Sequence, residues 1–286
     1  MNLSGHTKPY AVLGHPIGHT LSPVMHNAAF QALGMDAVYM AFDVAPDRLI
    51  SVLPSMADMG FGGVNLTVPL KQTAFEGLRD HDASSKMFRA VNTVQFLGGG
   101  NLKAHNTDSY GFLQAFDEAF QRSVEGKSVL VIGTGGAGRT VALTCASAEC
   151  GKMTLSDADP ERARKVASET GRRDVILCPS EPEKLCKACR RSDVVIQATP
   201  VGMKPDDPVL VPRDGFHEGQ LAFDLIYIYP MTRFMKEADA SGARVSNGLG
   251  MLLHQGARAF QIWTDVEPPV EEMRRALENE VYGNRN

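Results

Sequence analysis

The feature that most constrains this chain of 286 residues is a glycine-rich segment near its middle, VLVIGTGGAG. An apolar run at 129–132, typical of a buried strand, leads directly into it, and a helical pattern follows. In this context the first glycine allows a tight turn, the second lets a pyrophosphate approach the backbone, and the third lets helix and strand pack closely. The N–H groups at the helix start favour an anion. The expected dinucleotide-binding residues are Gly133, Gly135, Gly136, Ala137 and Gly138.

The pattern after residue 107 alternates strands with helices. Strands are expected at 127–132, 153–156, 175–177, 194–198 and 221–226, and helices at 108–120, 139–149 and 161–170. Such alternation predicts an α/β fold with a parallel sheet and helices on both faces.

Before residue 107 the expected strands and helices alternate less regularly. Strands are expected at 10–14, 38–44 and 63–68, a helix at 22–34, a helix at 48–59 that Pro54 kinks or splits, and a hairpin of 91–96 with 102–105. The chain ends in two expected helices, at 250–264 and 270–281. We therefore predict two domains with a boundary near residue 106, and the pattern leaves open which of them the final helices join.

Composition excludes several functions. Lys and Arg total 29 against 33 Asp and Glu, a net charge of −4, which disfavours nucleic-acid binding. Neither a membrane-spanning segment nor a secretory signal is visible, so we expect a cytoplasmic protein that binds no membrane. Cys186 and Cys189 form a C-x-x-C without a second cysteine pair, which indicates free thiols and no metal site.

The choice of dinucleotide depends on the strand at 153–156. It runs into Asp157, 19 residues after Gly138, where a carboxylate accepts hydrogen bonds from ribose hydroxyls and repels a 2′-phosphate. Ala158 follows, where an arginine would be needed to hold that phosphate. The sequence favours NAD, with NADP as the alternative because Arg162 and Arg164 are near.

Polar clusters at predicted strand ends are candidates for holding a substrate. Thr20 and Ser22 precede a helix, where two hydroxyls and a helix start suit a carboxylate, although Ser22 would equally serve as an N-cap. Asn65 and Thr67 alternate on a strand and so share a face.

Two further residues are candidates for chemistry. Lys71 begins the helix after that strand, and Asp108 follows the AVNTV segment that carries Asn92. By pattern alone, the simpler interpretations are a solvated lysine for Lys71 and a helix cap for Asp108.

The ordered motifs GHPIGHTLSPVMHNAAF, NLTVPLK, AVNTV, NTDSYG, GTGGAG, ATPVGM, DLIY and NGLGMLLHQG resemble the shikimate/quinate dehydrogenase family over nearly the whole chain. The resemblance implies a substrate domain of residues 1–106 completed by 250–286, and a Rossmann-type domain of residues 107–249. It implies an oxidoreductase that reversibly oxidises a ring hydroxyl of shikimate or quinate with NADP or NAD. A small cyclic hydroxy acid is thus the expected partner, and the chain is expected to be a monomer or a homodimer.

The resemblance also implies roles for single residues. Lys71 and Asp108 match the catalytic pair, from which we infer that Lys71 is the general acid/base and that Asp108 orients it and the reacting hydroxyl. The residues implied to hold the ring acid are Thr20, Ser22, Asn65, Thr67, Asn92, Tyr227 and Gln255. Those implied to line the nicotinamide half are Thr199, Gly202, Met203, Leu225 and Gly248.

The chain departs from the family pattern at three places. Thr20 stands where serine is usual, Ser156-Asp157-Ala158 stands where NADP-using members carry Asn-Arg-Thr, and Pro230 comes one residue late. The second departure agrees with the preference for NAD, and the first leaves shikimate, quinate and related cyclic acids all open as substrates. Alternative functions are another two-domain dehydrogenase of the methylenetetrahydrofolate type and an NAD-binding regulatory homologue without turnover.

Overall fold

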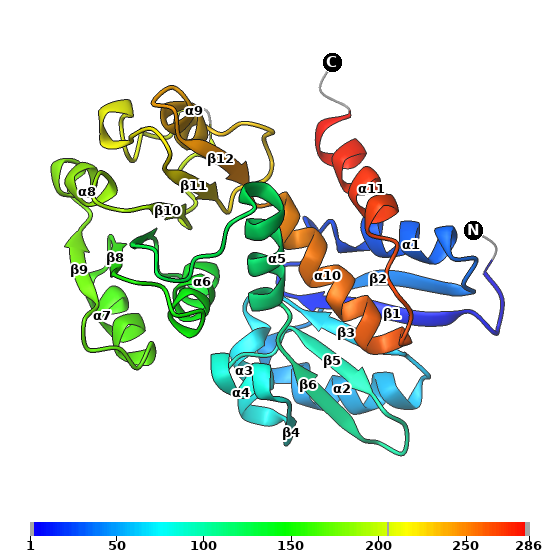
Figure 1. The fold of residues 1–286 in the computed structure, drawn as a ribbon. Coiled ribbons are helices and arrows are strands. Elements are labelled where there is room, and N and C mark those ends of the chain that lie inside the picture. Colours follow the sequence, from blue (N-terminus) through cyan, green and yellow to red (C-terminus); the bar gives the residue numbers. More distant parts are fainter. Residues whose placement is uncertain (1–2, 205, 284–286) are drawn as a thin grey trace. The chain divides into compact units, whose positions relative to one another are not determined.

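The computed structural model describes residues 3–204 and 206–283. It contains two compact units, one made of the residues up to Gly111 with those from Leu253 onward, the other of Phe112–Leu252. Each unit has its own six-stranded sheet, drawn in Figure 1 with blue to teal strands in the first unit and green to orange strands in the second. The expected α/β class with two domains is confirmed.

The sheet of the first unit is mixed, with strand order β2-β1-β3-β5-β6-β4. Its strands are β1 (Lys8–Gly14), β2 (Ala37–Asp43), β3 (Gly63–Leu66), β4 (Asp80–His81), β5 (Thr93–Phe96) and β6 (Leu102–His105). β1 pairs in parallel with β2 and β3, whereas β5 is antiparallel to both β3 and β6. The expected hairpin is thus present as β5 and β6, and its turn contains Gly98, Gly99 and Gly100, all with positive φ.

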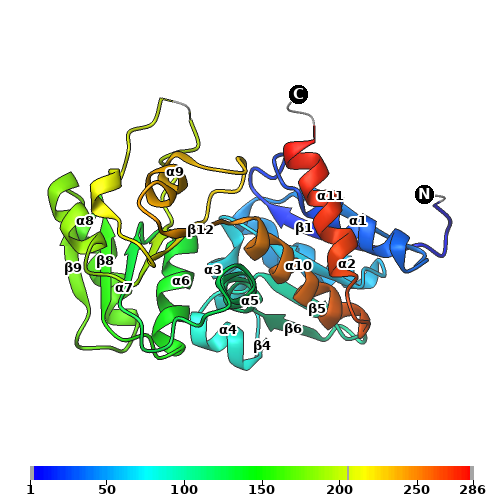
Figure 2. The same cartoon turned by 45° about the horizontal axis from the view of Figure 1, so that its top comes forward.

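Helices cover this sheet and bury its apolar side chains. They are α1 (Ser22–Ala32), α2 (Leu49–Asp58), α3 (Leu70–Gly77), α4 (Ala83–Phe88) and α11 (Val270–Tyr282), together with parts of α5 (Asp108–Phe120) and α10 (Leu249–Thr264). The terminal helix α11 packs along α1, as both Figure 1 and Figure 2 show. The core under α2 and α3 includes Leu13, Leu53 and Val64, each fully buried.

The sheet of the second unit is entirely parallel, with strand order β12-β11-β10-β7-β8-β9. Its strands are β7 (Val129–Ile132), β8 (Met153–Asp157), β9 (Ile176–Pro179), β10 (Val194–Gln197), β11 (Leu221–Asp224) and β12 (Arg244–Asn247). Its helices, besides parts of α5 and α10, are α6 (Gly136–Ser147), α7 (Pro160–Glu169), α8 (Pro182–Cys189) and α9 (Arg233–Asp239). Numbered within the unit this order is 3-2-1-4-5-6, that of a doubly wound dinucleotide-binding fold. Such a sheet binds ligands where the order reverses, which here is at the carboxyl ends of β7 and β10.

Some elements differ from expectation. Pro54 lies inside α2 without splitting it, and the break comes earlier, where a single 3₁₀ turn at Pro46–Arg48 precedes the helix. The helix expected from residue 139 begins at Gly136, because the glycine-rich turn itself forms the first helical turn. Short elements without a strong apolar period, α4, α9, β4 and β12, were not anticipated. No helix among residues 3–204 and 206–283 has the length and apolar character needed to cross a membrane.

Asp224 is a buried carboxylate that shapes the segment after β11. Its Oδ1 accepts the Ile226 N–H at 3.0 Å, and its Oδ2 accepts the hydroxyl of Thr232, the N-cap of α9, at 2.6 Å. Burial raises the pKa of Asp224 from 3.8 to about 6, against the lowering effect of these hydrogen bonds. The folded chain therefore keeps a proton on Asp224 at a pH where the unfolded chain has released it.

This shift predicts a pH-dependent stability. The unfolded state loses the Asp224 proton near pH 3.8 and the folded state near pH 6, so the free energy of unfolding falls as pH rises between these values and then levels off. Asp224→Asn has no proton to lose. In urea unfolding, its stability relative to the wild type should rise by about 1 kcal/mol from about pH 5 to about pH 7. A difference that stays constant across this range would contradict the buried, titrating carboxylate.

Candidate active site

Lys71 and Asp108 form an ion pair within the first unit. Lys71 lies in the first turn of α3 and Asp108 is the first residue of α5. Lys71 Nζ lies 2.6 Å from Asp108 Oδ2, and the side chains are 30% and 10% exposed, respectively. The carboxylate is thus largely covered, and most of the lysine side chain is covered too. The two interpretations left open by the sequence, a solvated lysine and a helix-capping aspartate, do not describe this arrangement.

Asn92 holds the second carboxylate oxygen of Asp108. Its side-chain amide donates to Asp108 Oδ1 at 2.8 Å and to Thr107 Oγ1 at 2.9 Å, and lies 3.4 Å from Gln255 Oε1. Its Oδ1 accepts the Thr107 N–H at 2.8 Å. Asn92 is 2% exposed, so these contacts lie away from water and fix the orientation of the Asp108 carboxylate.

Asn65 extends this network towards the two hydroxyl residues near the start of the chain. Its Nδ2 donates to the Asn92 carbonyl at 3.1 Å, and its Oδ1 accepts the Tyr39 hydroxyl at 2.7 Å. The Tyr39 hydroxyl is also hydrogen-bonded to Ser22, whose Oγ lies 3.3 Å from Thr20 Oγ1. One connected set of polar groups therefore joins the expected carboxylate-binding hydroxyls to the ion pair.

The structure changes the interpretation of Ser22. The N-cap position of α1 is occupied by Leu21, and no side chain caps this helix end. Ser22 is already helical, and its hydroxyl contacts Tyr39 and Thr20. The N-cap alternative for Ser22 is therefore wrong. Thr67 lies directly after β3 and is half-buried, with its methyl group so close to Gly14 that a Cβ there would lie 2.6 Å from it.

Tyr39 is a site residue that the sequence analysis missed. It lies in an apolar run on β2 and is 1% exposed, so its sequence context indicates only core. Its ring stacks on His26 with centroids 4.2 Å apart. Burial lowers the pKa of His26 to about 3 and raises the pKa of Tyr39 well above 10, so both rings are neutral near pH 7. Trp263 contacts the same aromatic layer and donates its indole N–H to the Val94 carbonyl.

The glycine-rich turn of the second unit has the geometry its sequence requires. Gly133 has φ +91, and a Cβ there would lie 2.7 Å from the Thr199 methyl group. A Cβ on Gly138 would lie 2.0 Å from the Gly133 carbonyl oxygen, so helix and turn are in close contact. Around Gly135 and Gly136, by contrast, no atom lies within 4 Å of the added carbon. The start of α6 is thus open to a group approaching the backbone, which fits the pyrophosphate of a dinucleotide.

Asp157 occupies the end of β8 beside this turn. Its Oδ2 accepts both the N–H and the hydroxyl of Thr134 at 2.7 Å, and its Oδ1 accepts the Asp159 N–H at 2.9 Å. Burial alone would raise the pKa of Asp157, but these hydrogen bonds and Arg162 lower it, so the carboxylate is ionised at neutral pH. Arg162 Nη1 lies 3.5 Å from Oδ1, and this arginine side chain is 53% exposed.

The segment after β10 carries three of the residues expected near the nicotinamide. The buried Gln197 side chain donates to the carbonyls of Thr199 and Val201, at 3.1 and 2.9 Å, and so fixes this turn. Gly202 has φ +108, and Met203 is 45% exposed.

The remaining residues expected in this unit follow β11 and β12. A Cβ on Gly248 would lie 2.2 Å from the Leu225 carbonyl oxygen, so only glycine fits there. Tyr227 is half-buried, and burial raises its pKa. Tyr227 belongs to the second unit, whereas the other residues expected to hold the ring acid all lie in the first.

The thiols of α8 give no sign of a metal centre. Cys186 is half-buried and Cys189 is buried, and burial raises the pKa of Cys189 to about 12. Within the part of the chain that the structure describes, no group of three or more His, Cys, Asp or Glu side chains is arranged to hold a metal ion.

Comparison with known proteins gives three consecutive family matches. Residues 12–94 match the shikimate dehydrogenase substrate binding domain, residues 115–203 match shikimate/quinate 5-dehydrogenase, and residues 248–278 match the shikimate 5′-dehydrogenase C-terminal domain. Together they span both units described above.

Individual proteins are similar over nearly their whole length. A shikimate dehydrogenase (NADP(+)) of Methanopyrus kandleri is 38% identical, with 97% of each chain covered. The structure of a Listeria monocytogenes shikimate 5-dehydrogenase in complex with shikimate and NAD has a TM-score of 0.89 and 33% identity, covering 97% of this chain and 98% of that one. A Corynebacterium glutamicum quinate dehydrogenase in complex with NAD has a TM-score of 0.87 and 28% identity, covering 95% and 98%. With its fold, its glycine-rich turn and these relatives all in agreement, the chain belongs to the shikimate/quinate dehydrogenase family.

Proposed function

We propose that this protein reversibly oxidises a ring hydroxyl of shikimate or quinate, with Lys71 and Asp108 as its catalytic pair. The observation that carries the proposal is the 2.6 Å contact between Lys71 Nζ and Asp108 Oδ2, with Asn92 on the other carboxylate oxygen. On this proposal the first unit holds the ring acid and the second unit holds the nicotinamide coenzyme. This corresponds to a substrate domain of residues 1–106 with 250–286 and a coenzyme domain of residues 107–249, each boundary within a few residues of the division between the units.

The proposed role of Lys71 is proton transfer at the reacting hydroxyl. Oxidation of a secondary alcohol releases the hydroxyl proton, and the Lys71 amine accepts it; in the reverse direction the ammonium returns it. Asp108 keeps Nζ in one place through their 2.6 Å contact, which the amine and the ammonium both make as hydrogen-bond donors, and presents its carboxylate to the same hydroxyl. Because Asn92 is buried and bonded to Asp108 Oδ1, the carboxylate does not rotate away from this position.

The proposed role of Thr20 and Ser22 is to hold the ring carboxylate. Their two hydroxyls lie 3.3 Å apart and precede or begin helix α1, whose free N–H groups favour negative charge. Tyr39 donates its only proton to Asn65, so the hydrogen bond between Tyr39 and Ser22 uses the Ser22 proton. A bound carboxylate would accept that proton in place of Tyr39. Asn65, Thr67, Asn92 and Gln255 would hold the ring hydroxyls.

For the coenzyme we propose NAD, with NADP as the competing possibility. Either one supplies the hydride acceptor C4 of its nicotinamide ring when bound. The ionised Asp157 at the end of β8 suits a free 2′-hydroxyl and opposes a 2′-phosphate. Relatives of both kinds exist, since the Methanopyrus protein is named for NADP(+) and the Listeria structure contains NAD. The half-exposed Arg162 is the group in this chain that a 2′-phosphate would contact.

The first prediction concerns Lys71. With shikimate and with quinate as substrates, Lys71→Ala should lower kcat by about two to four orders of magnitude, because it removes the acid/base group. NAD affinity, measured by titration of protein fluorescence or by calorimetry, should be nearly unchanged. Lys86→Ala, which removes an exposed lysine from α4, is the control and should keep wild-type turnover. Wild-type-like kcat in Lys71→Ala would refute the role. A wild-type protein that binds NAD but turns over neither acid would instead support a regulatory function.

The second prediction concerns coenzyme preference. Asp157→Asn keeps a hydrogen-bonding side chain but removes the charge, so the ratio of kcat/KM for NAD to that for NADP should fall about tenfold or more. Arg162→Ala should move the same ratio in the opposite direction, because it removes the only proposed contact for a 2′-phosphate. Steady-state kinetics with both coenzymes measure both ratios. If neither substitution moves the ratio, Asp157 does not determine the preference.

A further inference from the structure

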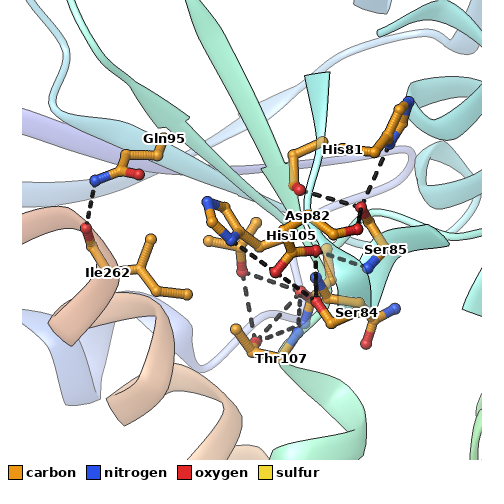
Figure 3. A network of polar contacts seen from close by, with 12 residues as sticks. His81, Asp82, Ser84, Ser85, Gln95, His105, Thr107 and Ile262 are labelled. Atoms are coloured by element: carbon orange, nitrogen blue, oxygen red, sulfur yellow. Dashed lines mark hydrogen bonds and ion pairs between the residues drawn. The ribbon is translucent and has the colours of Figure 1, made fainter. Parts of the chain in front are cut away.

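A second polar network in the first unit surrounds the start of α4, outside the proposed catalytic and binding residues (Figure 3). Asp82 is its centre and is the N-cap of α4. Its Oδ1 accepts the Ser85 N–H at 2.8 Å and the Ser84 hydroxyl at 2.7 Å, and its Oδ2 lies 3.0 Å from His105 Nδ1. The Asp82 N–H donates to the Ala104 carbonyl at 3.0 Å. The network therefore joins the first turn of α4 to the end of β6.

This network continues into the segment that carries Asp108. Ser84 Oγ, whose own proton is donated to Asp82, accepts the backbone N–H of Asn106 at 2.9 Å. The Asn106 side chain then accepts the backbone N–H of Asp108 on its Oδ1 at 3.1 Å and donates to the Ala90 carbonyl at 3.1 Å. Three hydrogen bonds in sequence thus connect the Asp82 carboxylate to the backbone of Asp108.

The polarity of these bonds is fixed by the charge on Asp82. Burial alone would raise the pKa of Asp82, but hydrogen bonds from His105, the Ser85 N–H and Ser84 lower it well below its usual range. An ionised carboxylate accepts hydrogen bonds only, so the Ser84 proton points to Asp82 and the Ser84 lone pairs face Asn106. Asn106 is 4% exposed, and without Ser84 its N–H would be buried without this partner.

We propose that Ser84, oriented by Asp82, is a positioning residue that sets the place of the Asp108 carboxylate beside Lys71. This inference rests on the proposed function, since it assigns to Ser84 an effect on turnover through Asp108. The link is not a local feature of the sequence, because Ser84 and Asn106, which form its middle hydrogen bond, are 22 positions apart in the chain. It exists only because α4 and β6 meet in the folded unit.

Ser85 provides a matched control in the same helical turn. It is fully buried, and its hydroxyl donates to the Ala104 carbonyl at 3.1 Å, so it also ties α4 to β6. Its side chain contacts His81, Ala104 and the backbone carbonyl of Asp82, but neither the Asp82 carboxylate nor Asn106. Loss of the Ser85 hydroxyl therefore removes a buried hydrogen bond of similar kind, without touching the segment that leads to Asp108.

The test compares the turnover of Ser84→Ala, Ser84→Thr and Ser85→Ala, with the acid and coenzyme that the wild type uses best. Ser84→Ala should lower kcat about tenfold, because small displacements of a catalytic group have effects of this size or larger. Ser84→Thr keeps the hydroxyl and should restore kcat to within about twofold of the wild type. Ser85→Ala should keep wild-type kcat even if thermal unfolding shows equal or greater loss of stability. Coenzyme affinity should stay the same in all three.

A double-mutant cycle separates positioning from a general structural effect. If Ser84 acts through the Asp108 carboxylate, Ser84→Ala should cause no further loss of kcat in an Asp108→Ala background. A full tenfold loss in that background would overturn the proposal, as would equal kcat for Ser84→Ala and Ser85→Ala. Should Ser84→Ala fail to fold, Asp82→Asn supports the same comparison, because asparagine retains N-cap function while the ionised acceptor is lost. Inactivity of the wild type would instead refute the proposed function itself.

Discussion

The ion pair between Lys71 and Asp108 is the central interaction of the candidate active site in the first unit. Neither residue is unusual alone: Lys71 lies in the first turn of a helix after a strand, and Asp108 begins a helix after a hairpin. Their contact requires α3, the β5–β6 hairpin and the start of α5 to converge. Asn92 makes that convergence specific, because it bonds the Asp108 side chain and the Thr107 backbone together in a buried position. Polar groups of this kind are costly to bury unless each finds its partner, which restricts the local backbone to one arrangement.

The parts of the fold with strong local signals could be predicted. Gly133, Gly135 and Gly138 indicate a strand, a turn and a helix because each glycine has a separate steric reason, and the structure shows the tight turn, the open backbone and the close packing. The alternation of strands and helices after residue 107 likewise predicts a parallel sheet. The polar residues of the site were found from motifs at strand ends. Pattern alone gave Lys71 and Asp108 ordinary explanations, a solvated lysine and a helix cap. The family resemblance paired them, and the structure shows their contact.

The parts that sequence analysis missed depend on contacts between distant segments. Helix α4 has six residues and no clear apolar period, so the sequence analysis did not predict it. Tyr39 looks like any core residue of a strand until the structure brings its hydroxyl to Asn65. Serine is a favourable N-cap residue, yet the N-cap of α1 is Leu21 and Ser22 is the first helical residue. The Ser22 hydroxyl is instead hydrogen-bonded to Tyr39. In each of these cases, contacts with residues distant in the sequence determine the local structure or the role of the side chain.

The second unit is one uninterrupted stretch of chain, Phe112–Leu252, inserted into the first. A gene exchange at two junctions would therefore replace the whole parallel-sheet unit with its glycine-rich turn and keep the residues around Asp108 intact. Both junctions, however, fall inside helices, after Gly111 in α5 and after Leu252 in α10. An α-helix turns by about 100° per residue, so one inserted or deleted residue at either junction would change which side chains of that helix face the core of the unit they belong to. Successful chimeras within this family should thus conserve the length of both helices before they conserve their sequence.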